Sequence, residues 1–205
     1  MQRNLIIRLF DENIYPHIIG DLKILDTIQP KTHSNSCAIP TAMLILSSLD
    51  ILGFLLRDTG QIDKSENNIT AALLHKDYFP TTKYQSDIIK SLCIFYRHGM
   101  MHGFYPRQTT KKIYGIHKSD GTILLEQLQY NGCNINSLNV NVLSNDFKSF
   151  IDKLYDEVST TQDNHFLENI IRGFKIFTQE ELTTSITTTN QTTIPFGVKS
   201  NKKLS

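Results

Sequence analysis

Apolar residues recur at spacings of three and four along much of the chain, which is the period of an amphipathic α-helix. This pattern predicts helices over residues 15–28, from Ser36 or a neighbour to near Gly60, and over residues 69–75, 83–103, 144–158 and 165–177. Polar stretches such as QPKTHSNS and QIDKSENN separate them and are typical of surface loops. We therefore expect a mainly α fold without internal repeats.

The most apolar stretch is CAIPTAMLILSSLDILGFLL, residues 37–56, which by length alone would admit a transmembrane helix. Asp50 lies well inside it, and an acid at such a position costs about 2.5–3.5 kcal/mol in a membrane. Ser47, Ser48 and Pro40 weaken a membrane span further. We therefore expect a buried helix of a soluble protein, with no membrane contact.

A second helix bears the most unusual polar residues of the chain. A stripe of apolar side chains predicts it from Lys83 onward: Ile88, Ile89, Leu92, Cys93, Tyr96 and Met100. Gly103 and Pro106 are typical of a helix end, so the stretch FYRHGMMHGFYP, residues 95–106, forms its carboxyl-terminal turn.

The remaining pattern predicts a small hairpin, one further cap and a flexible tail. Asp120-Gly121 stands between two apolar arms, which indicates a β-hairpin at about residues 111–129. The run Ser144, Asn145, Asp146 is suited to cap the next helix. Residues 181–205 are Thr-rich and carry too few apolar side chains to offset the entropy of ordering. We therefore expect one helical domain over residues 1–180 and a flexible tail over 181–205.

The amino-acid composition restricts the partners and the compartment of the protein but does not indicate a function. The chain has 205 residues, of which 40% are hydrophobic and 20% charged, with a formal net charge of +1, so a polyanionic partner must be bound by a local patch. The cysteines Cys37, Cys93 and Cys133 are odd in number and widely spaced, and no secretory signal precedes them. A reducing cytoplasm is therefore the expected compartment, with Cys37 and Cys93 acting as small core residues.

Arg97 and His102 are the candidate catalytic residues. Arginine keeps its charge and offers a planar fork of donors to phosphate oxygens, while histidine exchanges protons near neutral pH. Cleavage of RNA without a metal needs these two capacities, because the ribose 2′-hydroxyl attacks the neighbouring phosphorus and charge develops on the phosphate. The pair therefore suits metal-independent phosphodiester cleavage.

Helix geometry restricts how this pair can act. Residues five apart differ by about 140° around a regular helix, so Arg97 and His102 do not converge on an undisturbed one. Gly99 and Gly103 favour a loosened last turn, which would bring them together. Alternatively, a two-fold dimer assembles one site from both copies.

The run RHGMMH, residues 97–102, resembles the signature of the HEPN superfamily, an arginine followed by a polar residue and, four to six residues after the arginine, a histidine. The resemblance covers roughly residues 41–106. It implies a small helical bundle, commonly a homodimer, that acts as a metal-independent endoribonuclease in toxin–antitoxin, abortive-infection or antiviral systems. It also implies that Arg97 and His102 are catalytic, that His98 supports them, and that Asp50, in the preceding helix, orients the arginine. Some members have lost catalysis and only bind partners or nucleotides, which is the alternative function.

Simpler roles stay open for each of these residues. His102 at a helix end can interact with the last carbonyls and the helix dipole. Asp50 would be costly to bury alone, so an ion pair with Arg97 is expected, either structural or orienting.

Residues around the motif are candidates for RNA binding. Arg107, Lys111 and Lys112, continued by His117 and Lys118, form a cationic run that suits a phosphate track or the solvated edge of a hairpin. Tyr96, Phe104 and Tyr105 suit stacking on bases or packing in the core.

Metal and cofactor sites are not predicted. The histidines lack the spacing of metal ligands, and the chain has no Cys-x-x-Cys, no paired acidic motif of a metal nuclease and no glycine-rich phosphate loop. The expected partners are RNA, a second copy of the chain and an antitoxin protein.

Overall fold

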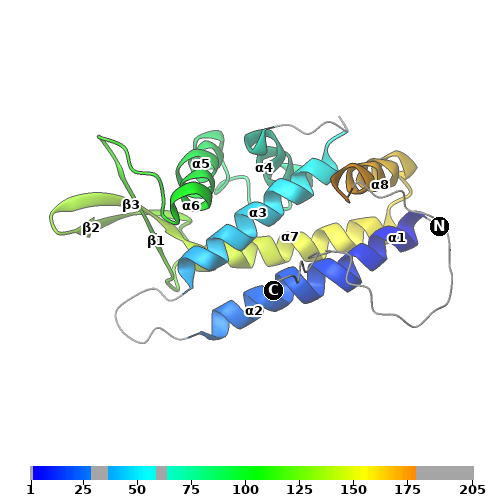
Figure 1. Ribbon diagram of the computed structural model, residues 1–205, viewed down its shortest axis with the longest axis horizontal. Coiled ribbons are helices and arrows are strands. Elements are labelled where there is room, and N and C mark those ends of the chain that lie inside the picture. The colour runs from blue at the N-terminus through cyan, green and yellow to red at the C-terminus, as the bar shows by residue number, and fades with distance from the viewer. Residues whose placement is uncertain (1, 29–36, 59–63, 179–205) are drawn as a thin grey trace, which may run out of the picture.

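The computed structural model of the chain describes residues 2–28, 37–58 and 64–178. Most of these residues lie in helices, and a three-stranded sheet lies at one end of the molecule (Figure 1). The predicted mainly α fold class is therefore confirmed. The predicted flexible tail, residues 181–205, lies outside the described residues.

The helices agree with the predicted positions, but several begin earlier. In chain order they are α1 (Gln2–Leu9), the π-helical η1 (Phe10–Ile19) and α2 (Gly20–Thr27), which are continuous; α3 (Ala38–Leu56); α4 (Ser65–Leu73) with the 3₁₀ turn η2 (His75–Asp77); α5 (Ser86–Ser91), the π-helical η3 (Leu92–Arg97) and α6 (His98–Gly103), also continuous; and α7 (Val140–Thr160) and α8 (Asn164–Thr178).

Two helix starts differ from the sequence prediction for local reasons. The first helix begins at Gln2 rather than near residue 15, because Ile6, Phe10 and Ile14 already bury one face at a spacing of four residues. Helix α7 begins at Val140 rather than at Ser144. Its cap is Asn139, whose side-chain oxygen accepts a hydrogen bond from the backbone N–H of Asn141 at 3.2 Å.

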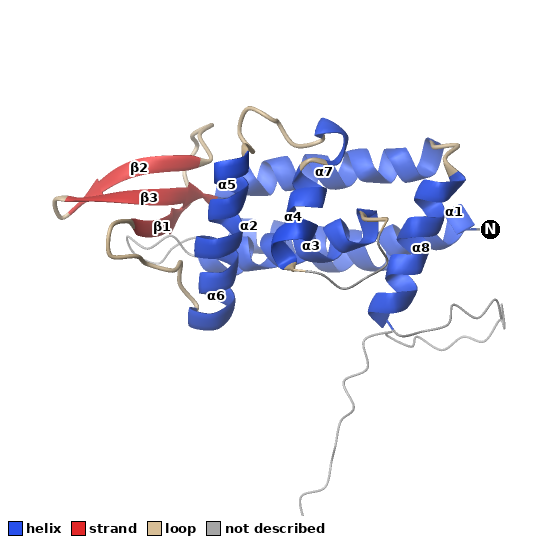
Figure 2. Ribbon diagram, turned by 90° about the horizontal axis from the view of Figure 1, so that it is seen from above, coloured by secondary structure: helices blue, strands red, loops and turns tan. Residues whose placement is uncertain are grey.

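Helix α3 is the central element of the bundle. It packs against α4, α7 and α8, and Figure 2 shows α4, α5–α6 and α8 crossing the longer helices. Ile45, Leu46 and Leu49 in its middle are fully buried. The helix is long and apolar enough to span a membrane, yet 56% of its apolar window is buried inside the protein, so it serves as the core helix of this fold.

A glycine allows α3 and α4 to approach closely. A Cβ atom on Gly53 would lie 1.7 Å from the backbone oxygen of Asn68, which is far inside van der Waals contact. The missing side chain therefore sets the distance between the two helices. This contact also fixes the position of Asn68, whose side chain is part of the site described below.

The predicted hairpin with its turn at Asp120-Gly121 is wrong. The strands are β1 (Ile113–His117), β2 (Leu125–Tyr130) and β3 (Cys133–Asn139), in the order β1-β3-β2. β1 pairs in parallel with β3, and only β2 and β3 form a hairpin. Its turn is Asn131-Gly132, where both residues have positive φ angles of 49° and 77°, as a tight hairpin turn requires.

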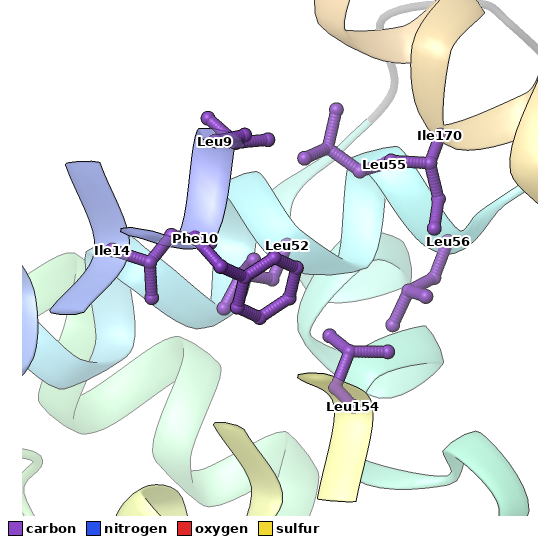
Figure 3. Close-up of a pocket in the computed structure, with 8 residues that line it drawn as sticks. All are labelled: Leu9, Phe10, Ile14, Leu52, Leu55, Leu56, Leu154 and Ile170. Carbon is purple, nitrogen blue, oxygen red and sulfur yellow. The ribbon is translucent and has the colours of Figure 1, made fainter. Parts of the chain in front are cut away.

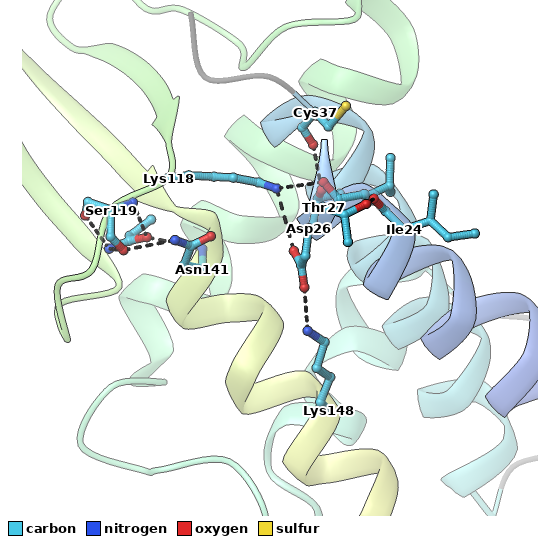
Figure 4. Close-up of polar contacts among 11 residues, drawn as sticks. Ile24, Asp26, Thr27, Cys37, Lys118, Ser119, Asn141 and Lys148 are labelled. Atoms are coloured by element: carbon cyan, nitrogen blue, oxygen red, sulfur yellow. Dashed lines mark hydrogen bonds and ion pairs between the residues drawn. The ribbon is translucent and has the colours of Figure 1, made fainter. Parts of the chain in front are cut away.

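Polar contacts fasten the sheet to the helices. Asn139, at the junction of β3 and α7, donates to the hydroxyl of Ser119 at 2.8 Å. Beside this junction the carboxylate of Asp26 in α2 pairs with Lys148 of α7 at 2.6 Å and with Lys118 at 3.6 Å (Figure 4). Lys118, predicted as part of a cationic run, is therefore engaged in a structural ion pair.

The core also contains a small void between α1, η1, α3, α7 and α8 (Figure 3). Its volume is about 10 Å³, and its lining is entirely apolar: Leu9, Phe10, Ile14, Leu52, Leu55, Leu56, Leu154 and Ile170. A space of this size with no polar partner does not suit even one water molecule. It is a packing defect rather than a ligand site.

Replacing Gly53 by alanine tests the close contact of α3 and α4. The added methyl group collides with backbone atoms of Asn68, so the two helices must separate, and we expect a loss of about 1–3 kcal/mol in the free energy of unfolding. Urea-induced unfolding followed by circular dichroism measures it.

The matched control is Gly103→Ala, because a Cβ atom there meets nothing within 4 Å. That variant should be neutral or gain up to about 1 kcal/mol. Equal unfolding free energies for the two variants would contradict the close-contact explanation.

Candidate functional site

The continuous helix α5–η3–α6, residues 86–103, bears the Arg97 motif, and its predicted buried stripe is confirmed. The inward side chains are all buried except the half-buried Ile88: Ile88, Ile89, Leu92, Cys93, Tyr96 and Met100. Arg97 is partly buried, while His98 and His102 are exposed. The helix therefore holds the motif on the side that faces away from the core.

Arg97 forms the predicted ion pair with Asp50. Its Nη2 donates to Oδ2 of Asp50 at 2.7 Å, and the two side chains are 24% and 16% exposed. The short distance and the partial burial make this a charge-assisted hydrogen bond. The expectation that the acid in the apolar helix is paired with Arg97 is thus confirmed.

The pair continues into a hydrogen-bond network that the sequence did not predict. The second carboxylate oxygen of Asp50 accepts from the side-chain amide of Asn68 at 2.9 Å, and Asn68 in turn accepts from Arg57 at 3.0 Å. Both oxygens of Asp50 are therefore occupied. The carboxylate cannot rotate without breaking one of these bonds, so Asp50 holds the Arg97 guanidinium in one position.

Arg97 lies at an open cleft of about 420 Å³ between α4 and the motif helix. The first turn of α4 and its cap contribute Lys64, Ser65 and Glu66. The remaining lining residues are Cys93, Ile94, Arg97, His98 and Arg107. The lining has three cations and one carboxylate, and Asp50 behind Arg97 adds a second carboxylate, so the cleft keeps a small positive local charge. Such a charge suits an anionic ligand although the whole chain is nearly neutral.

Arg107 reaches this cleft because the chain doubles back over the motif helix. Phe104, in the left-handed conformation with φ 56°, reverses the chain after α6. The backbone N–H of Arg107 then donates to the carbonyl of Phe95 at 2.6 Å. Gly99 makes this possible, since a Cβ atom there would lie 2.3 Å from the nitrogen of Arg107. Gly99 therefore permits a close approach.

The expected loosening of the helix between Arg97 and His102 does not occur. α6 is regular from His98 to Gly103, and the widened π-helical turn lies before it, over Leu92–Arg97. The backbone of Gly99 is covered by the returning chain, which keeps the helix intact. Within one chain Arg97 and His102 are therefore not brought to the same cleft.

His98, rather than His102, is the imidazole at the cleft. His98 lines the cleft, and His102 follows it one helical turn later. The centroids of the two rings are 4.5 Å apart. Neither ring forms a hydrogen bond within the described parts of the chain. The two histidines thus form an exposed pair of which one member borders the cleft.

Of the two roles predicted for Tyr96, packing in the core is confirmed and stacking on bases is wrong, while the other RNA-binding candidates lie on the surface. Tyr96 is fully buried, and its hydroxyl donates to the carbonyl of Asn136 in β3 at 2.8 Å. Tyr105 is 54% exposed, and Lys111 and Lys112 are exposed on the turn that leads into β1. These three stand on the segment that also contains Arg107.

Cys93 in the cleft is a core residue, as predicted. Burial, and then the neighbouring carboxylates of Glu66 and Asp50, raise the pKa of its thiol to about 12. The thiol therefore stays protonated and is a poor nucleophile or metal ligand. Among the described residues no three His, Cys, Asp or Glu side chains gather as a metal site would require.

A second polar cluster lies inside the sheet and is enclosed. Nδ1 of His117 lies 2.7 Å from the hydroxyl of Ser137, and Nε2 lies 3.5 Å from Glu126. The order serine, histidine, carboxylate resembles a nucleophilic triad, but Ser137 is only 2% exposed, so no substrate reaches it. Burial lowers the pKa of His117, which favours its neutral form as a link between the three strands.

Sequence reasoning missed the contribution of α4 to the site. Lys64, Ser65, Glu66 and Asn68 belong to the polar stretch QIDKSENN, which was interpreted as a surface loop. The available signal was the acid in a polar first turn directly before the apolar run that begins at Ile69. Only the fold shows that this turn faces Arg97.

Compared with protein-family models, with curated proteins and with solved structures, the chain matches none of them. Conclusions on its function therefore depend on its own residues and their arrangement.

A double-mutant cycle tests the Asp50–Arg97 pair. Asp50→Ala, Arg97→Ala and the double variant should show a coupling of about 0.5–3 kcal/mol in unfolding free energy, because the pair is partly buried and the carboxylate is held on both sides.

The matched control is Arg8 and Glu12, an exposed pair on the first helix with a similar distance of 2.9 Å. Its coupling should be about 0.3–0.5 kcal/mol, the range of exposed helix pairs. Additive effects at Asp50 and Arg97 would show that the two side chains do not stabilise each other.

Proposed function

We propose that the protein is a metal-independent endoribonuclease of the toxin or abortive-infection type, which cleaves RNA by attack of a ribose 2′-hydroxyl on the adjacent phosphorus. The observation that carries this proposal is the cationic cleft in which Arg97, fixed by Asp50, lies with Arg107 and His98. The cleft offers positive charge and an imidazole to the same bound group.

The two arginines stabilise the phosphate. The Arg97 guanidinium is held by its bond to Asp50, so it does not have to be repositioned when charge develops. The backbone bond from Arg107 to Phe95 brings the exposed Arg107 side chain to the same cleft. Fixed donors aimed at a developing anion are commonly the largest contribution to catalysis. Both arginines keep their charge throughout the accessible pH range, so this stabilisation does not depend on a bound metal.

The imidazoles of His98 and His102 supply proton transfer. His98 borders the cleft, and His102 contacts the ring of His98. The two histidines of the HEPN-like signature therefore lie on the same face of the helix. Proton transfer by a positioned imidazole contributes about 10²- to 10⁴-fold to a rate. The resemblance of residues 97–102 to that signature supports this assignment.

In this proposal, RNA leaves the cleft along the segment that follows α6 and contains Arg107, here called the returning segment. Arg107 lies in the cleft, and Lys111 and Lys112 are exposed beyond it, which suits a track of successive phosphates. Tyr105 and Phe104 are 54% and 75% exposed beside this track, so their rings are available to stack on unpaired bases.

A homodimer is the proposed active form. Met101, Phe104 and Tyr105 expose apolar surface at the end of α6, next to His102, and Ile51 of α3 adds to the exposed apolar residues. A two-fold contact through this end would bury them and place His102 of one copy near the cleft of the other. We place the protein in the cytoplasm, with a dedicated antitoxin protein as a further partner.

A second candidate is a nucleotide-binding module without catalysis. The cleft volume of about 420 Å³ lies within the range of about 300–1,000 Å³ that is usual for small-molecule sites. In that case Arg97 and Arg107 hold a phosphate of a mononucleotide, and the imidazoles make contacts without transferring protons.

RNA cleavage by the purified protein in the presence of EDTA tests the main proposal. We expect cleavage of a single-stranded RNA, no cleavage when the target nucleotide is 2′-deoxy, and a 2′,3′-cyclic phosphate on the product. Arg97→Ala should lower kcat by about 10²- to 10³-fold, because a fixed cation at the phosphate is lost.

Arg8→Ala is the matched control, since Arg8 is an exposed arginine on the far helix α1 and lies outside the cleft. It should cleave like the wild type. Nucleotide binding without any RNA cleavage by the wild type would favour the second candidate, and equal activity of both arginine variants would reject the role of Arg97.

The dimer is tested separately by light scattering. Phe104→Glu introduces a charge at a 75% exposed apolar side chain and should convert a dimer into a monomer without unfolding it. Ile24→Glu is the control, because Ile24 is 61% exposed on α2, away from the motif. A monomeric wild type, or a dimer insensitive to both changes, would contradict the proposed interface.

A further inference from the structure

Glu66 is the one carboxylate among the described residues that line the cleft. It lies in the first turn of α4, across from the motif helix, and its side chain is exposed. It forms no hydrogen bond or ion pair within the described residues. An acid that stands among cations without pairing is available to a ligand.

Glu66 lines the same cleft as Cys93 and Arg97 of the motif helix. Its charge acts on the buried thiol of Cys93, where it is the second cause, after burial, of a pKa raised to about 12. Cys93 belongs to the motif helix, one turn before Arg97. The charge of Glu66 therefore acts on a residue of the motif helix, close in sequence to Arg97 of the proposed phosphate site.

Four other titratable or charged groups besides this thiol surround Glu66. Lys64 lies on the same turn, Arg97 and His98 come from the motif helix, and Arg107 comes from the returning segment. A carboxylate can accept a proton, and an imidazole can donate one. The cleft thus holds a proton acceptor and a proton donor on facing elements.

We propose that Glu66 and His98 are the general base and the general acid of the RNA cleavage proposed above, on which this assignment depends. Glu66 takes the proton of the 2′-hydroxyl, and His98 gives a proton to the leaving 5′-oxygen. Arg97 and Arg107 hold the phosphate between them.

The step balances without any further reactant. The 2′-oxygen forms a bond to phosphorus as its proton passes to Glu66, and the bond from phosphorus to the 5′-oxygen breaks as that oxygen receives the proton of His98. The products are a 2′,3′-cyclic phosphate and a 5′-hydroxyl. Exchange with solvent then removes the proton from Glu66 and restores that of His98.

The other candidates for these roles are occupied or badly placed. Both oxygens of Asp50 accept hydrogen bonds, from Arg97 and Asn68, so it cannot serve as the base. The Cys93 thiol stays protonated. Within one chain His102 lies one turn beyond the cleft and contacts the ring of His98, so it could reach a bound phosphate only in the cleft of a second copy.

The test is the pH dependence of RNA cleavage by Glu66→Gln and His98→Ala. A base and an acid together give a bell-shaped profile of kcat against pH. Glu66→Gln should lower kcat by about 10²- to 10³-fold, leave KM little changed and remove the acidic limb. His98→Ala should lower kcat similarly and remove the alkaline limb.

Controls with the same chemical change separate catalysis from stability. Glu168→Gln alters an exposed carboxylate on α8, and His17→Ala an exposed imidazole on η1, and both should retain the wild-type profile. The melting temperatures of all four variants should match that of the wild type, because the four side chains are exposed.

The outcomes distinguish the two proposals. If the wild type does not cleave RNA, the proposed function is overturned and this assignment with it. If the wild type cleaves, Arg97→Ala is inactive and Glu66→Gln keeps both its rate and its acidic limb, the assignment of Glu66 alone is overturned. Loss of the acidic limb in Glu66→Gln but not in Glu168→Gln supports it.

Discussion

The arrangement of the site depends on one carboxylate in the most apolar helix of the protein. Burying an ionised side chain within the core helix α3 costs free energy unless the charge has partners. Asp50 has two hydrogen-bond partners, Arg97 and Asn68. The first ties the motif helix to α3, and the second ties α4 to α3. Because both bonds converge on one side chain, the need to satisfy Asp50 also fixes the arginine at the wall of the cleft.

Two glycines allow the chain to bring the remaining groups to that arginine. Gly53 lets the backbone at Asn68 lie against α3, which places the first turn of α4 and its Glu66 opposite the motif helix. Gly99 lets residues 105–107 lie against the motif helix, which places Arg107 beside Arg97. The cleft is therefore assembled from three segments, and close backbone packing at the two glycines acts together with the polar bonds of Asp50 to hold them.

The polar groups around the cleft divide into two sets. Asp50, Asn68 and Arg57 bond to one another or to Arg97 and act as the support, which a folded protein keeps rigid. The side chains of Glu66, His98 and Arg107 border the open space without a hydrogen bond in the described structure. The network thus fixes the cation of Arg97 behind the cleft, while Glu66 and His98 offer groups that exchange protons and Arg107 offers a second cation.

The sequence by itself determined the features that depend on local pattern. The helical periods, the helix that bears Arg97 and the need of Asp50 for a cationic partner follow from side chains within one segment or from the cost of burying one charge. Only the tertiary structure decided which segments meet. Asp120-Gly121 and Asn131-Gly132 are both good turn signals, but β1 pairs with β3, so only the second closes a hairpin. Likewise Tyr96 is buried against β3, and Glu66 lines the same cleft as Arg97. Packing between distant segments, which no local pattern encodes, sets these neighbours.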